Sequence, residues 1–190
     1  MRELTYYVAT SLDGRIAAPD GDFSAFPVTG DHIDMVLEEW TDTLPAPALA
    51  ALGLTPPATR FDAVVMGWRT YTSGFPHGVH DPYPHLDQVV VTRRHLDADV
   101  PPGVRLTDDP VGEVERLKAA DGVGVWLCGG GDLAGTLIDQ VDRLVLKINP
   151  VLLGEGAPVL SASYAVRGFE LDRARTFASG VVVAEYARAT

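Results

Sequence analysis

Residues 123–138, VGVWLCGGGDLAGTLI, place three consecutive glycines between an apolar run and a segment with helical spacing. The run before the glycines predicts a buried strand, and Leu133, Leu137 and Ile138 predict one face of a helix. Glycine weakens either element, because it removes side-chain packing and adds chain entropy. The stretch therefore indicates either a tight structural turn or a ligand that contacts the main chain.

Within this stretch, residues 129–134, GGGDLA, match the weaker form G-x-G-x-x-A of the dinucleotide fingerprint. That motif normally follows the first strand of its domain, with a second parallel strand ending in an acidic residue. Most of this chain precedes the glycines, and the residues after them have mainly strand character. A Rossmann-type dehydrogenase is therefore the weakest of the candidate functions.

Outward from the glycines, strands alternate with helices until residue 138 and then follow one another directly. Thr29 or Asp31 would cap the first helix, and residues 41–60 form an excursion with one or two helical turns. This order predicts an α/β protein with a mixed sheet, parallel first and antiparallel at its end. With 190 residues, no repeat and no linker, we expect a single domain over 1–190. The expected strands are 4–9, 61–67, 88–92, 122–128, 142–150 and two within 168–188 joined at Ser179-Gly180; the expected helices are 31–40, 111–121 and the segment after the glycines.

The formal net charge of −11 disfavours nucleic acid or an anionic membrane as the main partner. One cysteine, Cys128, excludes an intrachain disulfide and a cysteine-based zinc site. His77, His80 and His85 lie in a proline-rich loop without a matching carboxylate pattern, so no metal site is expected. No signal-peptide profile or membrane span is evident, which predicts a cytoplasmic protein.

A small anionic ligand still requires a local basic patch, and VVVTRRHL (89–96) supplies one. Thr92, Arg93 and Arg94 come directly after an expected strand. Guanidinium groups suit a phosphate dianion, although a pair of solvated arginines on an ordinary loop would give the same pattern.

Four stretches in this order together resemble the dihydrofolate reductase-like superfamily. They are YYVATSLDGRIAAPDGDF, DAVVMGWRTYTSG, VWLCGGGDLAGTLI and PVLLGEGAPVL, with a closing β hairpin after them. The chain is most similar to the C-terminal reductase domain of the bacterial riboflavin-biosynthesis deaminase/reductase. The resemblance implies a three-layer, dihydrofolate reductase-like mixed sheet, mostly parallel with an antiparallel C-terminal hairpin, and often a cis Gly-Gly peptide at the glycine turn.

The resemblance also implies that NADPH lies across the C-terminal edge of the sheet. Ala9, Ile16 and Ala17 would present backbone to the nicotinamide, and Thr92, Arg93 and Arg94 would bind the adenosine 2′-phosphate. Trp68 stands where related sequences often have arginine, so one cofactor contact is expected to differ. Two sets would meet the pyrophosphate from opposite sides: Gly67, Trp68, Arg69 and Thr70, and Gly129, Gly130, Gly131, Asp132 and Leu133.

By resemblance, the chain is an NADPH-dependent reductase of a small heterocycle of pterin, folate or ribosylaminopyrimidine type, and a homodimer. Asp31 is the candidate proton donor, although helix capping is about twice as favoured for it. The alternative function is a non-catalytic nucleotide- or flavin-binding protein on the same fold. The H-x-E and P-C-x-x-C signature of the deaminase half is absent, so a stand-alone reductase-like domain is expected.

Overall fold

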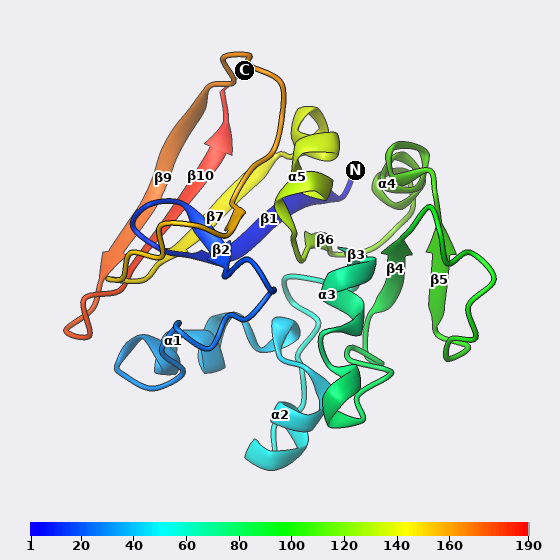
Figure 1. Cartoon of the computed structure of the whole chain (residues 1–190), viewed down its shortest axis with the longest axis horizontal. Helices are drawn as coiled ribbons and strands as arrows, with labels where there is room; N and C mark the ends of the chain where they lie inside the picture. Colours follow the sequence, from blue (N-terminus) through cyan, green and yellow to red (C-terminus); the bar gives the residue numbers. More distant parts are fainter. Residues whose placement is uncertain (190) are drawn as a thin grey trace.

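The computed structural model describes residues 1–189 and contains an eight-stranded sheet in the order β5-β4-β3-β6-β1-β7-β10-β9 (Figure 1). A two-stranded ribbon, β2-β8, lies beside it. The strands are β1 Glu3–Thr10, β2 Arg15–Ala17, β3 Ala63–Gly67, β4 Asp87–Val91, β5 Val104–Thr107, β6 Gly124–Leu127, β7 Arg143–Ile148, β8 Ala157–Pro158, β9 Phe169–Thr176 and β10 Val182–Arg188. The α-helices are α1 His32–Glu39, α2 Ala46–Leu52, α3 Trp68–Thr72, α4 Pro110–Ala119 and α5 Gly131–Leu137, and short 3-10 helices cover Thr41–Thr43, Phe75–His77 and Ile138–Gln140.

The pairing directions confirm the predicted mixed sheet. β1 runs parallel to both β6 and β7, and β3, β4, β5 and β6 continue the parallel part. β10 pairs antiparallel with β7 and β9, so the C-terminal hairpin closes the sheet at one edge. A parallel strand needs a crossover connection, and these crossovers cover both faces of the sheet with helices.

Two separate cores hold the three layers together. On one face, Met35 and Val36 of α1 and Tyr71 of α3 pack with Val64, Val145 and other buried side chains. On the opposite face, Leu117 of α4 and Leu133 of α5 pack with Val65, Leu127 and their neighbours. Figure 1 shows α1, α2 and α3 on one side of the sheet and α4 and α5 on the other.

The structure corrects two local expectations. Asp31 occupies the position before α1, but its side chain makes no capping hydrogen bond, and neither does that of Thr29. Strand β5 and the ribbon β2-β8 were not anticipated, since they are only two to four residues long. The excursion over 41–60 contains one 3-10 turn and α2, as expected.

Within residues 1–189, no helix combines the length and the hydropathy that crossing a bilayer requires.

Candidate functional site at the carboxyl edge of the sheet

The parallel strands end at one edge of the sheet, and their connections diverge there. The connection after β3 leads to α3 on one face, whereas the connection after β6 leads to α5 on the other. Ligands of open α/β sheets bind outside the carboxyl ends of the strands, where neighbouring connections leave in opposite directions. The edge between β3 and β6 is therefore the expected binding crevice.

The two glycine-containing loops meet at this point. The Gly67 amide donates to the Gly129 carbonyl oxygen at 3.4 Å. The amide of Cys128, which directly precedes Gly129, donates to the Val65 carbonyl oxygen at 3.0 Å. A Cβ added at Gly67 would meet no heavy atom within 4 Å, so the backbone of this residue faces open space. The sequence prediction that these loops share one site is consistent with this geometry.

The three consecutive glycines have three different environments. Gly129 has a φ of +97°, which only glycine adopts readily. A Cβ on Gly130 would make an ordinary contact of 3.7 Å with Ile16, whereas one on Gly131 would lie 2.2 Å from the Pro158 carbonyl oxygen. The ribbon β2-β8 thus packs directly over this loop and brings Ile16 to it. The Gly129–Gly130 peptide bond is cis, as the resemblance predicted.

The turn after β1 is tied to the loop that precedes β8. Asp13 accepts hydrogen bonds from the Ser11 hydroxyl at 2.6 Å and from the backbone amides of Leu153 and Gly154 at 3.1 and 2.7 Å. The Ser11 hydrogen bond, and after it the backbone ones, lower the pKa of Asp13 to about 2. Asp13 therefore stays ionised and fixes the segment that carries Ile16 and Ala17.

The basic loop after β4 is ordered by Thr92. Its hydroxyl accepts from the backbone amides of Arg94 at 3.3 Å and His95 at 3.2 Å, and the residue itself is buried. Thr92 thus shapes the turn, whereas Arg93 and Arg94 are exposed to solvent.

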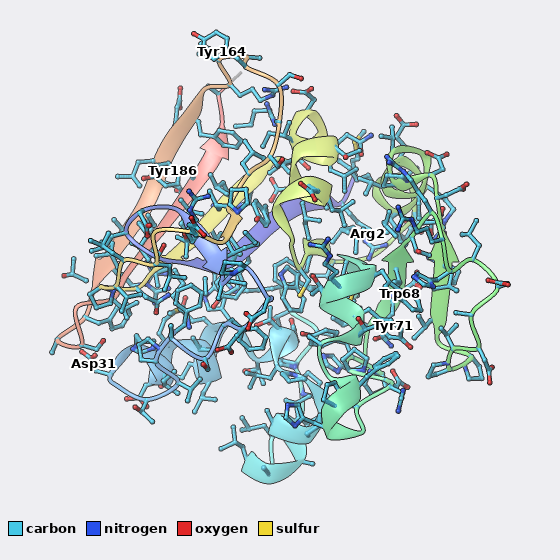
Figure 2. The ribbon with its side chains drawn as sticks, viewed as in Figure 1. Arg2, Asp31, Trp68, Tyr71, Tyr164 and Tyr186 are labelled. Carbon is cyan, nitrogen blue, oxygen red and sulfur yellow. The ribbon has the colours of Figure 1, made fainter. Side chains whose placement is uncertain are left out.

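Trp68 and His95 join this loop to α3. Their rings stack with centroids 4.3 Å apart and an interplanar angle of 16°, and Trp68 also contacts Tyr71 on the same helix. Figure 2 shows Trp68 and Tyr71 next to each other on α3. His95 was missed by the sequence analysis, because nothing in the local pattern reveals a contact between residues so far apart in the chain.

Three arginines at this edge lack partners in the described part of the chain. Arg69 at the start of α3, Arg93 and Arg94 make no side-chain hydrogen bond or ion pair there, whereas every other arginine makes at least one. All three are exposed. In an acidic chain, three unpaired guanidinium groups make this edge a candidate anion-binding surface.

The start of α5 fits the expected contacts less well. The Leu133 side chain is buried in the second core, which leaves only its backbone for a ligand. Asp132 is exposed and carries a negative charge, which is unfavourable next to a phosphate.

Asp31 lies before α1, against the turn between β9 and β10, and its environment opposes the predicted role of proton donor. Its carboxylate accepts from the backbone amides of Ala178 and Ser179, in the turn between β9 and β10, the latter at 3.0 Å. A hydrogen bond from the Ser179 side chain and these amides lower its pKa, so that it stays ionised. Figure 2 shows it beside α1, and we interpret it as a tie between α1 and the hairpin.

Cys128, directly after β6, is the one thiol close to the glycine turn. Burial raises the pKa of Cys128 to about 12, which keeps it a neutral thiol. Over residues 1–189, no group of three or more His, Cys, Asp or Glu side chains could hold a metal ion.

With the site described, comparison with known proteins shows a clear family relationship. The model of the RibD C-terminal domain family matches residues 2–183. Among curated proteins, the uncharacterised YyaP of Bacillus subtilis is 39% identical over 83 residues, which are 43% of this chain and 44% of that protein. YwjB of the same organism is 24% identical over 166 residues, 83% of this chain and 82% of that protein.

Solved structures show the same fold at low identity. A Shewanella sp. PV-4 protein, described as a candidate riboflavin biosynthesis protein, has a TM-score of 0.69 and 21% identity, with both chains covered in full. A Thermotoga maritima enzyme named as a diaminohydroxyphosphoribosylaminopyrimidine deaminase and 5-amino-6-(5-phosphoribosylamino)uracil reductase has a TM-score of 0.69 and 17% identity; the match covers 99% of this chain and 57% of that one. RibD of Acinetobacter baumannii has a TM-score of 0.65 and 16% identity, with 100% and 58% covered. This chain thus spans little more than half of those two proteins, and the dihydrofolate reductase-like fold is confirmed.

Proposed function

The chain belongs to the RibD C-terminal domain family, and from this premise we propose that it is an NADPH-dependent reductase of a small heterocycle of pterin, folate or ribosylaminopyrimidine type. The observation that carries the proposal is the set of unpaired arginines, Arg69, Arg93 and Arg94, at the edge where two glycine loops meet.

Strand order supports an extended cofactor along this edge. From β4 through β3 and β6 to β1 there are three inter-strand steps, or about 14 Å at the usual spacing. Arg93 and Arg94 after β4 would hold the 2′-phosphate, and Gly67 and Arg69 would meet the pyrophosphate together with the glycine turn. Ala9, Ile16 and Ala17 would then present backbone to the nicotinamide. The open space at Gly67 and Gly129 and the unpaired arginines support this arrangement, so these residues fit the phosphate groups of NADPH.

When bound, NADPH supplies the hydride for reduction of a C=N or C=O bond. The chain's residues hold and orient it: Asp13 fixes the turn that carries Ile16, and the stack of Trp68 on His95 fixes the loop that carries the arginines. Because these loops are already ordered, they lose less conformational entropy when the cofactor binds.

The test is titration with NADPH and NADH, and then the same titrations of Arg93→Ala. We expect tighter binding of NADPH, and Arg93→Ala should reduce that preference by about 1.5 kcal/mol, or roughly tenfold. Arg116→Ala is the matched control, because Arg116 is exposed but pairs with Glu113 far from this edge. Equal affinity of the parent protein for both cofactors would contradict the proposal.

The alternative, a non-catalytic nucleotide- or flavin-binding protein, is favoured by one observation. The hydrogen bonds to Asp31 keep it ionised, and Cys128 stays protonated, so neither is suited to exchange a proton near neutral pH. A panel of pterins, folates and ribosylaminopyrimidines, monitored by loss of nicotinamide absorbance, separates the two functions. Binding of cofactor without turnover of any compound would favour the alternative.

The proposal includes the cytoplasmic location expected from the sequence, and a homodimer, which rests on the family resemblance and on the apolar strands late in the chain.

A further inference from the structure

Lys147 lies one strand beyond the proposed nicotinamide position. It is in β7, where its register partner on β1 is Ala9 and its partner on β10 is Val183. In the sheet order, β7 comes after β1 on the side away from β6, β3 and β4. A cofactor that extends from β4 to β1 therefore ends next to Lys147, one inter-strand step of about 4.8 Å away.

Lys147 shares the α1 face of the sheet with Tyr7 and Ala9. Val145, two residues earlier in β7, packs in the core that contains Tyr7 and Val183, and residues two apart in a strand lie on the same face. His32 of α1 is close enough for the Lys147 charge to act on it: burial and then that charge lower the His32 pKa. Lys147 is thus placed between the end of β1 and the start of α1.

The ammonium of Lys147 has no partner among the described residues. The chain has only two lysines, and the other, Lys118, donates to the Asp142 carboxylate at 2.6 Å and to the Gln140 carbonyl oxygen at 3.0 Å. Lys147 makes no side-chain hydrogen bond or ion pair there, although the sequence contains 26 acidic residues. It is partly buried, and burial lowers its pKa.

Two acidic residues on elements next to Lys147, one on β10 and one before α1, have other partners. Asp31 is held by the amides of the β9–β10 turn, and Glu185 of β10 pairs with Arg175. A partly buried charge without a counter-charge is costly, so a negatively charged ligand group at this position would be stabilised by Lys147.

We propose that Lys147 binds an anionic oxygen group, a carboxylate or a phosphate, of the substrate beside the nicotinamide. This rests on the proposed function, and it narrows the substrate to an acidic heterocycle. The cofactor's own phosphates do not compete for this residue, because their candidate ligands come after β3, β4 and β6 on the other side of β1. Lys147 is thereby a specificity-determining residue, and it supplies no hydride or proton in this role.

Nitrogen-15 labelling of lysine gives a direct test, since the chain contributes only two side-chain signals and Lys118 is the internal control. The protein is first saturated with NADP⁺, and acetate, inorganic phosphate or neutral acetamide is then titrated at constant ionic strength set with sodium chloride. We expect a saturable shift of the Lys147 Nζ signal with acetate or phosphate, no shift with acetamide, and an unchanged Lys118 signal. Whether acetate or phosphate binds more tightly distinguishes a substrate carboxylate from a substrate phosphate.

Lys147→Met assigns the signal and tests the consequence. In this variant we expect the affinity for the preferred anion, measured by calorimetry, to fall about tenfold or more, and NADPH affinity to stay within about twofold. Lys147→Arg should keep most of the anion affinity and shows whether loss in the Met variant reflects charge or folding. If NADPH binds but neither anion moves the Lys147 signal, this inference is overturned while the proposed function stands. If NADPH does not bind, the proposed function is contradicted, and the inference about Lys147 falls with it.

Discussion

Gly67 is the position at which one added methyl group tests the proposed cofactor site most cleanly. Its φ of −78° and ψ of 160° are accessible to alanine, and a Cβ there meets no protein atom within 4 Å. We expect Gly67→Ala to fold normally and to weaken NADPH binding by about 2 kcal/mol, because the methyl group would occupy the space of the pyrophosphate. Calorimetric titration of the folded variant measures the change.

Gly103→Ala is the matched control for this substitution. A Cβ on Gly103 also meets nothing within 4 Å, and the residue lies in the turn before β5, outside the candidate site. It should bind NADPH like the parent protein. Equal affinities of the two variants would show that the bound cofactor does not contact Gly67.

At this scale the sequence predicted the positions of residues relative to strands better than it predicted their contacts. Arg93 and Arg94 could be placed at a strand end because a buried apolar run precedes them directly. The partners of Asp13, Leu153 and Gly154, could not be predicted, since they lie far away in the sequence and donate through backbone amides that carry no residue signature. The position of Asp31 beside Ser179 was unpredictable for the same reason.

Packing between α5 and the ribbon β2-β8 requires glycine at position 131. A Cβ there would lie 2.2 Å from the Pro158 carbonyl oxygen, and this atom belongs to the backbone of β8 and cannot rotate away. We expect Gly131→Ala to lower the free energy of unfolding by about 2–3 kcal/mol, measured by urea denaturation. Gly103→Ala again serves as control, and an unchanged midpoint for Gly131→Ala would show that β8 shifts freely.

The longer elements were predicted and three short strands, β2, β5 and β8, were missed, for a physical reason. The helix over 111–121 shows apolar periodicity, and α4 is found at Pro110–Ala119. β5, with four residues, and β8, with two, contain too few residues for a period to appear. Their conformation is imposed by the neighbours β4 and β2, so it depends on tertiary pairing rather than on local sequence.

For the whole molecule, the resemblance predicts a homodimer. Large apolar side chains are exposed in one segment: Leu160, Tyr164, Val166 and Leu171 are 38%, 96%, 86% and 59% exposed. Figure 2 shows Tyr164 at the upper edge of the molecule. We expect light scattering at micromolar concentration to give twice the monomer mass of 20.3 kDa, and Tyr164→Ser to weaken the dimer. Phe23→Ser, which alters an exposed aromatic residue elsewhere, should leave the mass unchanged; a monomeric parent protein contradicts the prediction.

The order of strands in the sheet was only partly accessible from the sequence. Alternation of strands and helices predicted parallel pairing, and the final apolar runs around Gly180 predicted the antiparallel hairpin. That β6 inserts between β3 and β1 was not predicted, because this position depends on the packing of helices on both faces of the sheet rather than on local periodicity.

Glu39 connects parts of the molecule that are remote in the chain. At the end of α1, its carboxylate pairs with Arg60, which precedes β3, at 3.2 Å, and with Arg173 of β9 at 3.3 Å. It also pairs with Arg175, which in turn reaches Glu185 of β10. The network therefore fastens the first helix to the C-terminal hairpin, and both partners of the Glu39–Arg175 pair are largely shielded from water, at 27% and 19% exposure.

Replacing Glu39 removes the charge that three arginines share, so we expect Glu39→Gln to lower the free energy of unfolding by about 2 kcal/mol at neutral pH. Burial raises the pKa of Glu39, but the hydrogen bond and charges of the arginines lower it overall. A carboxylate with a lowered pKa in the folded protein stabilises it above the pKa of the unfolded chain, and this contribution is lost as the pH falls through the folded value. The difference in the free energy of unfolding between the parent protein and Glu39→Gln should therefore shrink on acidification below about pH 4.

Glu38→Gln, at an exposed position without an ion pair in the described chain, should change stability little at any pH. Urea denaturation at several pH values measures all three proteins, and a Glu39→Gln difference that persists at low pH would mean that charge is not what fastens α1 to the hairpin.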